Sequence, residues 1–211
     1  MKWDAAIATF ALTLLNACLP PSGQEPPPPT TGPDRALSFT VSLLGRHEHA
    51  PRCAGVIVGA RAIMTMEHCA GGQRALSYVP LERDRAGIKA SRPRSAVIGD
   101  CFGHGVDRLC LARSRQHFAS WAEIEPNPLE QDAWSVYVDD GVLRQKKIGF
   151  APWLTYLVLN YRAPFGASGS GIWEGGRLIG LVARRHGADT FALNGRVLAE
   201  ALQQPETPPE S

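Results

Sequence analysis

The sequence of 211 residues lacks two features that would point to particular classes of protein. It has almost no surplus of charge, because 22 Lys and Arg stand against 20 Asp and Glu, for a net charge of +2. Domains that bind nucleic acid carry a basic surface, so we expect no nucleic-acid partner. There is also no long apolar run, since Ala5–Leu15 falls well short of the roughly 20 residues that a membrane-spanning helix needs. The sequence therefore excludes a polytopic membrane protein.

Proline is scarce through most of the chain, which separates a folded domain from its flanks. Of 17 prolines, seven lie between Pro20 and Pro33 and three lie between Pro205 and Pro209. Segments so rich in proline bury too little apolar surface to fold by themselves. We therefore predict one domain at residues 36–204, between a linker at residues 18–35 and a disordered tail at residues 205–211.

The first residues have the pattern of an export signal, with Lys2 before the apolar run and small residues after it. The tetrapeptide Leu15-Asn16-Ala17-Cys18 resembles the lipobox of bacterial lipoproteins, in which a peptidase cuts before a cysteine that is then acylated. The resemblance implies a signal peptide at residues 1–17 and a lipid anchor on Cys18. It places the protein in the bacterial cell envelope, with Leu19 favouring the outer membrane, facing the periplasm or the cell surface. An ordinary cleaved signal is the alternative.

Cysteine is sparse, and an exported protein meets an oxidising compartment in which cysteines pair. With Cys18 set aside, four cysteines remain: Cys53, Cys69, Cys101 and Cys110. Four cysteines allow three pairings, and the even count fits two disulfides. We expect no metal site, because the cysteines lack the spacing of zinc ligands and His47-Glu48-His49 lies in a charged loop. Nothing in the sequence indicates a cofactor.

Short apolar or alternating segments, punctuated by glycine and polar clusters, recur through the domain. Eleven such segments occur: Leu37–Leu44, Gly55–Val58, Ala62–Met66, Ser77–Pro80, Ala96–Ile98, Leu109–Ala112, Ala133–Val138, Leu154–Leu159, Gly171–Trp173, Leu178–Ala183 and Thr190–Leu193. Their spacing predicts an all-β barrel or sandwich. The only helix that we predict is terminal, at Arg196–Gln203, where the apolar residues form one stripe.

Three stretches, far apart in the sequence, each carry a residue suited to acyl transfer. His68 is followed by Cys69, Asp107 precedes an apolar strand, and Ser168 lies in the glycine-rich turn Phe165–Gly171. Serine is a weak nucleophile unless an imidazole accepts its proton, and the imidazole needs a carboxylate that fixes its tautomer. In a tight glycine turn, successive backbone N–H groups can point at one developing oxyanion. Ser170 competes with Ser168 for the role of nucleophile, and Asp100 competes with Asp107.

In the order His, Asp, Ser, these stretches resemble those of trypsin/chymotrypsin-like serine peptidases. Thr65-Met66-Glu67-His68-Cys69 is similar to the family's Thr-Ala-Ala-His-Cys, and Gly166-Ala167-Ser168-Gly169-Ser170 to its Gly-Asp-Ser-Gly-Gly. Asp107-Arg108-Leu109-Cys110-Leu111 resembles its Asp-Ile-Ala-Leu-Leu. The resemblance implies two β-barrels with trimmed loops and a C-terminal helix, and a serine endopeptidase that acts on a protein or peptide substrate.

The same resemblance implies roles for single residues. His68, Asp107 and Ser168 would form a catalytic triad, and the N–H groups of Gly166 and Ser168 an oxyanion hole. Cys53 and Cys69, 16 positions apart, match the family's disulfide around its histidine. Cys101 and Cys110 are then left for a second disulfide.

The primary pocket is harder to place. By resemblance, its floor falls at Arg162 and one wall at Ala183, Arg184 and Arg185. With Arg162 pointing inward, the pocket would attract an acidic residue, because guanidinium pairs with carboxylate. With Arg162 outward and the other two arginines in solvent, a small apolar pocket lined by Ala163 and Ala183 would remain. Neither arrangement favours Lys or Arg in the substrate.

Two other functions stay open. The altered residues around His68 and Ser168 allow a non-catalytic lipoprotein of peptidase fold that binds a protein partner. A lipoprotein with a structural role in the envelope and no peptidase ancestry is the third possibility.

Overall fold

The computed structural model describes residues 33–44, 51–84, 87–103, 107–128, 132–139 and 142–204. Within these residues the strands are β1 (Thr40–Leu44), β2 (Pro51–Gly59), β3 (Ala62–Met66), β4 (Ala75–Asp84), β5 (Gly87–Ala90), β6 (Arg94–Phe102), β7 (Leu109–Ser114), β8 (Asp132–Asp139), β9 (Val142–Trp153), β10 (Tyr156–Leu159), β11 (Gly171–Glu174), β12 (Arg177–His186) and β13 (Asp189–Asn194). The helices are α1 (Pro33–Phe39), α2 (Glu67–Ala70) and α3 (Gly195–Gln203). None of these helices has the length and apolar content to cross a bilayer.

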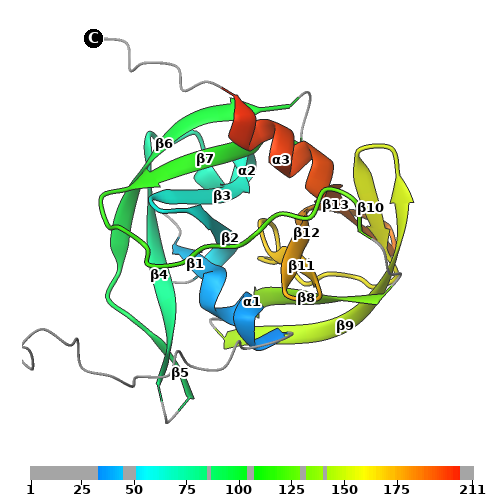
Figure 1. Ribbon diagram of the computed structural model, residues 1–211, viewed down its shortest axis with the longest axis horizontal. Helices are drawn as coiled ribbons and strands as arrows, with labels where there is room; N and C mark the ends of the chain where they lie inside the picture. The colour runs from blue at the N-terminus through cyan, green and yellow to red at the C-terminus, as the bar shows by residue number, and fades with distance from the viewer. Residues whose placement is uncertain are drawn as a thin grey trace, which may run out of the picture. The chain divides into compact units, whose positions relative to one another are not determined.

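The strands form two closed antiparallel barrels, which confirms the predicted fold (Figure 1). The N-terminal barrel runs in the order β1-β2-β3-β7-β6-β4 and closes where β4 pairs with β1, while β5 extends β4 on its other side. The C-terminal barrel runs in the order β10-β13-β12-β11-β8-β9 and closes where β9 pairs with β10. The closed barrels leave few unpaired strand edges, which are a liability in open sheets.

The alternation of side chains along the strands creates three apolar cores. In β2, Ile57 packs inside the N-terminal barrel, whereas its neighbours Val56 and Val58 belong to a core shared by the two barrels. In β3, Ile63 and Met64 divide in the same way. The shared core also takes residues of the C-terminal barrel and of both longer helices: Ala36, Phe39, Val136, Trp173, Leu181, Leu198 and Ala201. The two barrels are therefore joined by buried apolar surface.

The terminal helix is confirmed, and its start has a clear cause. Asn194 precedes α3 in extended conformation, and its side-chain oxygen accepts a hydrogen bond from the Val197 N–H at 3.2 Å. This is the N-cap arrangement that satisfies a donor in the first turn of a helix. Leu198 and Ala201 are buried on the inner face.

The prediction of a strand from Leu37 was wrong for its first part, because α1 includes residues as far as Phe39. Pro33 begins the helix, a position at which proline removes no hydrogen bond. Hydroxyl groups at its other end satisfy helix carbonyls, since Ser38 donates to the Arg35 oxygen and Thr40 to the Ala36 oxygen. The strand begins only at Thr40.

Two strands and a short helix were missing from the sequence-based prediction. β9 has 12 residues, but only Ile148 and Phe150 among them are buried, so its sequence shows little apolar alternation. β5 has four residues and pairs with β4 alone. The helix α2 has four residues, which is too short for a periodic pattern. Leu154 and the following residue form the turn between β9 and β10 rather than the start of a strand.

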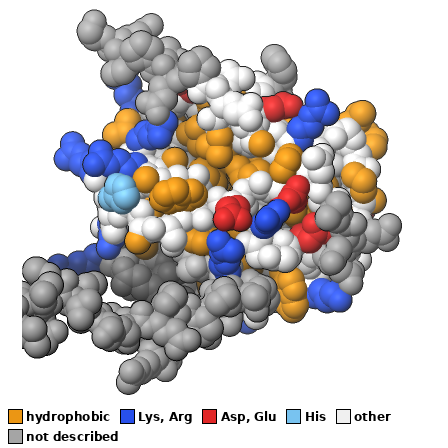
Figure 2. Space-filling view, in the orientation of Figure 1, with side chains coloured by type: hydrophobic (Ala, Val, Ile, Leu, Met, Phe, Trp, Pro, Cys, Tyr) orange, Lys and Arg blue, Asp and Glu red, His pale blue; other side chains and the backbone are white. Residues whose placement is uncertain are grey.

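The surface carries charges of both signs. Figure 2 shows acidic and basic side chains on the same face, several of them next to one another. Arg177, for example, pairs with both Glu123 and Glu125. Such exposed pairs contribute little to stability.

Candidate active site

His68 lies on α2, which directly follows the fully buried strand β3. The helix is tied to the N-terminal barrel from two directions. The Glu67 N–H donates to the Arg108 carbonyl oxygen at 2.8 Å, and Cys69 forms a disulfide with Cys53 of β2. These two links hold the short helix, and with it the backbone of His68, in place at the edge of the barrel.

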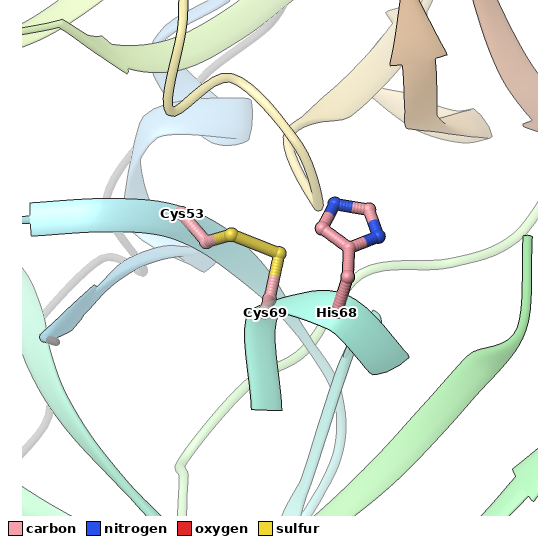
Figure 3. A group of neighbouring side chains, drawn as sticks. All are labelled: Cys53, His68 and Cys69. Atoms are coloured by element: carbon pink, nitrogen blue, oxygen red, sulfur yellow. A yellow bond between two sulfur atoms is a disulfide. The ribbon is translucent and has the colours of Figure 1, made fainter. Parts of the chain in front are cut away.

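Both expected disulfides are confirmed, Cys53–Cys69 and Cys101–Cys110. The imidazole of His68 lies beside the first of them, with a ring nitrogen within 4.8 Å of both sulfur atoms (Figure 3). Because these sulfurs are bonded to each other, they offer no thiolate to a metal ion. The grouping of histidine and cysteines is therefore a packing arrangement around the disulfide. The other candidate, His47-Glu48-His49, lies outside the described residues.

Asp107 is buried directly before β7, at the strand entry that the sequence indicated. Its Oδ2 atom accepts a hydrogen bond from the Tyr156 hydroxyl at 2.8 Å and lies 3.0 Å from the Nε of Arg184. A buried carboxylate needs such partners, because its charge has lost water. Both partners come from the C-terminal barrel, so Asp107 also connects the two barrels.

The environment of His68 favours its neutral form. The side chain reaches the surface, yet protein surrounds enough of the ring that burial lowers its pKa below the ordinary value. The negative charges of Asp107 and, more weakly, Glu67 act in the opposite direction and raise the pKa. Because burial is the larger effect, the imidazole is uncharged at neutral pH and able to accept a proton.

Ser168 lies in the loop between β10 and β11, in a turn that two glycines make possible. Gly166 and Gly169 have φ values of 88° and 78°, in the left-handed region that residues with a Cβ rarely adopt. Ala167 between them is fully buried in the core of the C-terminal barrel. The Gly169 N–H donates to the Val182 carbonyl oxygen at 2.8 Å, which ties the loop to β12. The loop is thus held by the buried side chain of Ala167 and by the hydrogen bond of Gly169.

The same loop leaves two backbone donors available. The N–H groups of Ala167, Gly169 and Ser170 donate to carbonyl oxygens of the protein. Those of Gly166 and Ser168 make no backbone hydrogen bond within the described part of the chain. These two are the groups predicted to form the oxyanion hole, which needs backbone N–H donors that are not used by carbonyl oxygens of the protein.

The loop that carries Ser168 and the helix α2 that carries His68 both contact β2. The Ala54 N–H donates to the Ser168 carbonyl oxygen at 2.8 Å, and Ala54 is adjacent to the cysteine that is bonded to Cys69. Cys69 Sγ lies 3.7 Å from the same Ser168 oxygen. A Cβ on Gly169 would overlap the Ala54 carbonyl oxygen, so only glycine permits this approach. Residues 99 positions apart in the chain are thereby in contact.

The geometry separates the competing serines and aspartates. Ser170 is fully buried, and its hydroxyl has no hydrogen-bond partner among the described residues, whereas Ser168 is half-buried. Of the two aspartates, Asp107 is the one whose charge raises the pKa of His68, as the charge of Glu67 also does. Asp100 lies within β6. Access to substrate and proximity to the imidazole therefore favour Ser168 and Asp107.

The residues expected at the primary pocket divide into three groups. Arg162 is exposed, and Ala163 and Ala183 are buried. The guanidinium of Arg185 donates to the Ala163 carbonyl oxygen at 3.1 Å and lies 4.4 Å from the ring centre of the exposed Phe165. Arg184 binds Asp107 and is therefore not simply solvated.

An open cavity of about 540 Å³ lies elsewhere, along β9, β10 and the start of β13. It is lined by Phe150, Val158, Asn160 and Asp189, among others, and none of the predicted site residues contributes to it. Its volume suits a small ligand, but it lacks a nucleophile. The region of His68, Asp107 and Ser168 rather than the cavity is therefore the candidate site.

Sequence reasoning missed the partners of Asp107. Tyr156 lies in the predicted strand Leu154–Leu159, and the sequence gives it no further role. Arg184 had been assigned to the pocket wall. Their contact with Asp107 depends on how the barrels dock, which no local pattern records.

Known structures share this architecture, although no protein-family model and no curated protein sequence matches the chain. The protease domain of MamO from Magnetospirillum magneticum aligns with a TM-score of 0.63 and 18% identity, over 81% of this chain and 98% of that chain. The inactivated protease paralogue SMIPP-S-D1 of the scabies mite aligns with a TM-score of 0.62 and 11% identity, over 79% and 91% of the two chains.

The serine protease of a human pathogenic astrovirus aligns with a TM-score of 0.58 and 12% identity, over 75% of this chain and 90% of that chain. Identities this low establish the fold and leave the activity to be argued from the site. The chain has the two-barrel fold of the trypsin-like serine proteases.

Proposed function

We propose that the protein is a serine endopeptidase in which His68, Asp107 and Ser168 form the catalytic triad. The observation that supports this most strongly is the shared anchorage on β2. Ala54 binds the Ser168 carbonyl oxygen, and the adjacent Cys53 is bonded to Cys69 next to His68. Because both segments are attached to the same strand, the orientation that proton transfer between their side chains requires is maintained.

The mechanism follows from the roles of these groups. The neutral imidazole of His68 accepts the proton of Ser168 as the serine oxygen attacks the carbonyl carbon of a peptide. Asp107 stabilises the imidazolium, and the N–H groups of Gly166 and Ser168 bind the oxyanion. His68 then donates the proton to the leaving amine. Water, deprotonated by His68, hydrolyses the acyl-enzyme and restores Ser168.

The proposed substrate preference excludes Lys and Arg at the position before the scissile bond. Arg162, Arg184 and Arg185 all belong to the segments expected around the primary pocket, and like charges repel in a partly desolvated site. An acidic or a small apolar residue fits these surroundings better. Cleavage of a peptide library with every residue at that position tests this, and a clear preference for Lys or Arg would overturn it.

We further propose that Cys18 is the acylated N-terminus of the mature protein and anchors it in the bacterial envelope, at the outer membrane. The proposal rests on Leu15–Cys18 and the proline-rich segment that follows, which lie outside the described residues. Several acyl chains on one residue anchor a protein firmly, where a single chain does not. Mass spectrometry of the native N-terminal peptide decides this, and an unmodified Cys18 in an envelope fraction would contradict it.

A second candidate is a non-catalytic protein of the same fold that binds a protein partner. The observation that favours it is the use of Asp107 Oδ2 by Tyr156 and Arg184. No hydrogen bond joins His68 to Asp107 or to Ser168 in the described residues. One structural neighbour, the scabies mite protein, is itself described as inactivated.

Cleavage of an unstructured protein such as casein separates the two candidates. The purified chain should cleave it, Ser168→Ala should not, and Ser170→Ala should retain the activity. Ser170→Ala is the matched control, because it removes a buried hydroxyl with no described partner from the same loop. Equal activity of wild type and Ser168→Ala would exclude the proposed mechanism.

A further inference from the structure

Two side chains from the C-terminal barrel converge on one oxygen of Asp107. The Tyr156 hydroxyl on β10 donates to Oδ2 at 2.8 Å, and Arg184 Nε on β12 lies 3.0 Å from the same atom. The Asp107 side chain is only 5% exposed, whereas that of Arg184 is 44% exposed. The second oxygen, Oδ1, has no described hydrogen-bond partner.

An aromatic cluster fixes the orientation of Arg184. Its guanidinium carbon lies 5.7 Å from the ring centre of Tyr156 and 5.5 Å from that of Phe191. These two rings meet edge to face at 6.0 Å, and Trp153 stacks on Tyr156 at 6.2 Å. Arginine over aromatic faces is held by cation–π attraction. Contacts with two aromatic rings therefore hold Arg184 beside Asp107.

A similar pairing occurs at the other carboxylate near His68. Arg108 Nη1 lies 2.7 Å from Glu67 Oε1, and Arg108 also donates to the Cys101 carbonyl oxygen at 3.0 Å. The charged groups that act on His68 are Asp107 and Glu67, and the disulfide beside the ring is uncharged. Each of the two carboxylates thus has an arginine of its own.

We propose that Tyr156 and Arg184 are positioning residues of the triad, which fix Asp107 through Oδ2, leave Oδ1 for the imidazole of His68, and offset part of the Asp107 charge. This inference rests on the proposed peptidase function. Its consequence is that the imidazolium is stabilised less than it would be beside an uncompensated carboxylate. His68 then remains a neutral base at a more acidic pH than it otherwise would.

The positional and electrostatic parts of this role can be separated by substitution. Arg184→Gln removes the charge while preserving polarity, and Arg184→Lys keeps the charge without the planar fork. Tyr156→Phe removes one hydroxyl and keeps the ring. Arg177→Gln is the matched control, because Arg177 lies on the same strand and pairs with Glu123 and Glu125 instead.

The primary measurement is the NMR titration of the His68 imidazole, assigned by its absence in His68→Ala. Arg184→Gln should raise the pKa of His68, because Asp107 would then act on the ring uncompensated. Arg184→Lys should lie closer to wild type, and Arg177→Gln should not differ from it. An unchanged titration in Arg184→Gln would overturn the electrostatic role, and a loss of melting temperature alone would show a purely structural contact.

The second measurement is kcat/KM as a function of pH. In Arg184→Gln the acidic limb should move to higher pH, and in Tyr156→Phe kcat should fall roughly tenfold with little movement of the limb, because a misplaced carboxylate slows proton transfer. Wild-type kcat in Tyr156→Phe would overturn the positional role. If the wild-type chain cleaves nothing, the peptidase proposal fails, while an upward shift of the His68 titration would still support the charge compensation.

Discussion

The two barrels carry different parts of the proposed site, and they differ in their covalent cross-links. The N-terminal barrel carries His68 and Asp107 and contains both disulfides. The C-terminal barrel carries Ser168 and has no cysteine, since the last cysteine of the chain is Cys110. The proposed base and its carboxylate partner are therefore both on the barrel that has disulfides.

The C-terminal barrel has buried side-chain hydrogen bonds but no disulfide, whereas the N-terminal barrel has both. Ser135 and Tyr161 share a hydrogen bond of 2.6 Å in its interior, and Thr190 bridges the Tyr161 carbonyl oxygen and the Ala163 N–H. The turn that carries Ser168 depends on glycine and on a hydrogen bond from the opposite barrel. The proposed triad is complete only when the barrels dock, because neither barrel carries all three of its residues.

The largest expected effect tests whether each barrel contributes an indispensable group. Ser168→Ala and His68→Ala should each lower kcat by about 10⁴- to 10⁶-fold, and Asp107→Asn by about 10⁴-fold. The double variant of Ser168 and His68 should be no worse than either single one, because the residues act as a unit. Steady-state kinetics on a peptide substrate measures this. Damage from Asp100→Asn with Asp107→Asn silent would show that the aspartate is misassigned.

The next effect concerns the packing of the Ser168 loop on β2. Gly169→Ala places a Cβ into the Ala54 carbonyl oxygen at a φ of 78°, so we expect a loss of about 3 kcal/mol or more in the free energy of unfolding. Gly175→Ala is the matched control. Gly175 has a φ of 55° but open space around it, and its loss should be about 1 kcal/mol. Equal losses in urea denaturation would contradict the close approach of the barrels.

Removal of the disulfide beside His68 probes the cross-linked barrel. Cys53 and Cys69 enclose a separation of 16 residues, for which the chain-entropy model gives about 3 kcal/mol of stabilisation. The double substitution to alanine should lower the free energy of unfolding by that amount and reduce kcat as well. The Cys101/Cys110 pair, with a separation of 9, is the comparison and should differ by less than 1 kcal/mol. Stability that does not change on removal of Cys53–Cys69 would refute the assigned role.

The smallest of these effects is a pH dependence that arises in the C-terminal barrel. Burial raises the pKa of Tyr161 to about 12, although its hydrogen bond with Ser135 acts in the opposite direction. The folded protein therefore keeps a proton that the unfolded chain releases near pH 10. The free energy of unfolding should fall as the pH rises from about 10 to about 12, by roughly 2 kcal/mol.

The double variant Ser135→Ala with Tyr161→Phe is the control for this alkaline effect, because it removes the ionisable group and leaves no unpaired hydroxyl. Denaturation at several alkaline pH values should show a weaker slope for this variant. An identical slope would mean that other groups cause the dependence.

The sequence predicted those parts of the molecule that local patterns encode. The strand Ala62–Met66 has the predicted bounds, the terminal helix lies one residue from its predicted start, and both disulfides formed as expected. β9 was missed because ten of its 12 residues are at least partly exposed, so it forms through its pairing with β8 and β10 rather than through apolar alternation. The helix α1 was mistaken for strand because its apolar residues adjoin those of β1.

The site was predictable only as far as its motifs extend. His68, Asp107 and Ser168 were found from their neighbours in the sequence, and their roles stay predictions. The contact of Tyr156 with Asp107 joins residues 49 positions apart and depends on how the two barrels pack. The pairing of Glu67 with Arg108 explains two departures from the family's motifs, because each residue is the partner of the other.

The most direct test of the central claim is reaction with a fluorophosphonate, followed by intact-mass and peptide analysis. Such a probe modifies a serine only where a base activates it. We predict one adduct, located on Ser168, and none in His68→Ala at the same probe concentration and time. A folded wild-type chain that takes up no probe, or takes it up at Ser170, would contradict the claim that the two barrels together form an active serine peptidase.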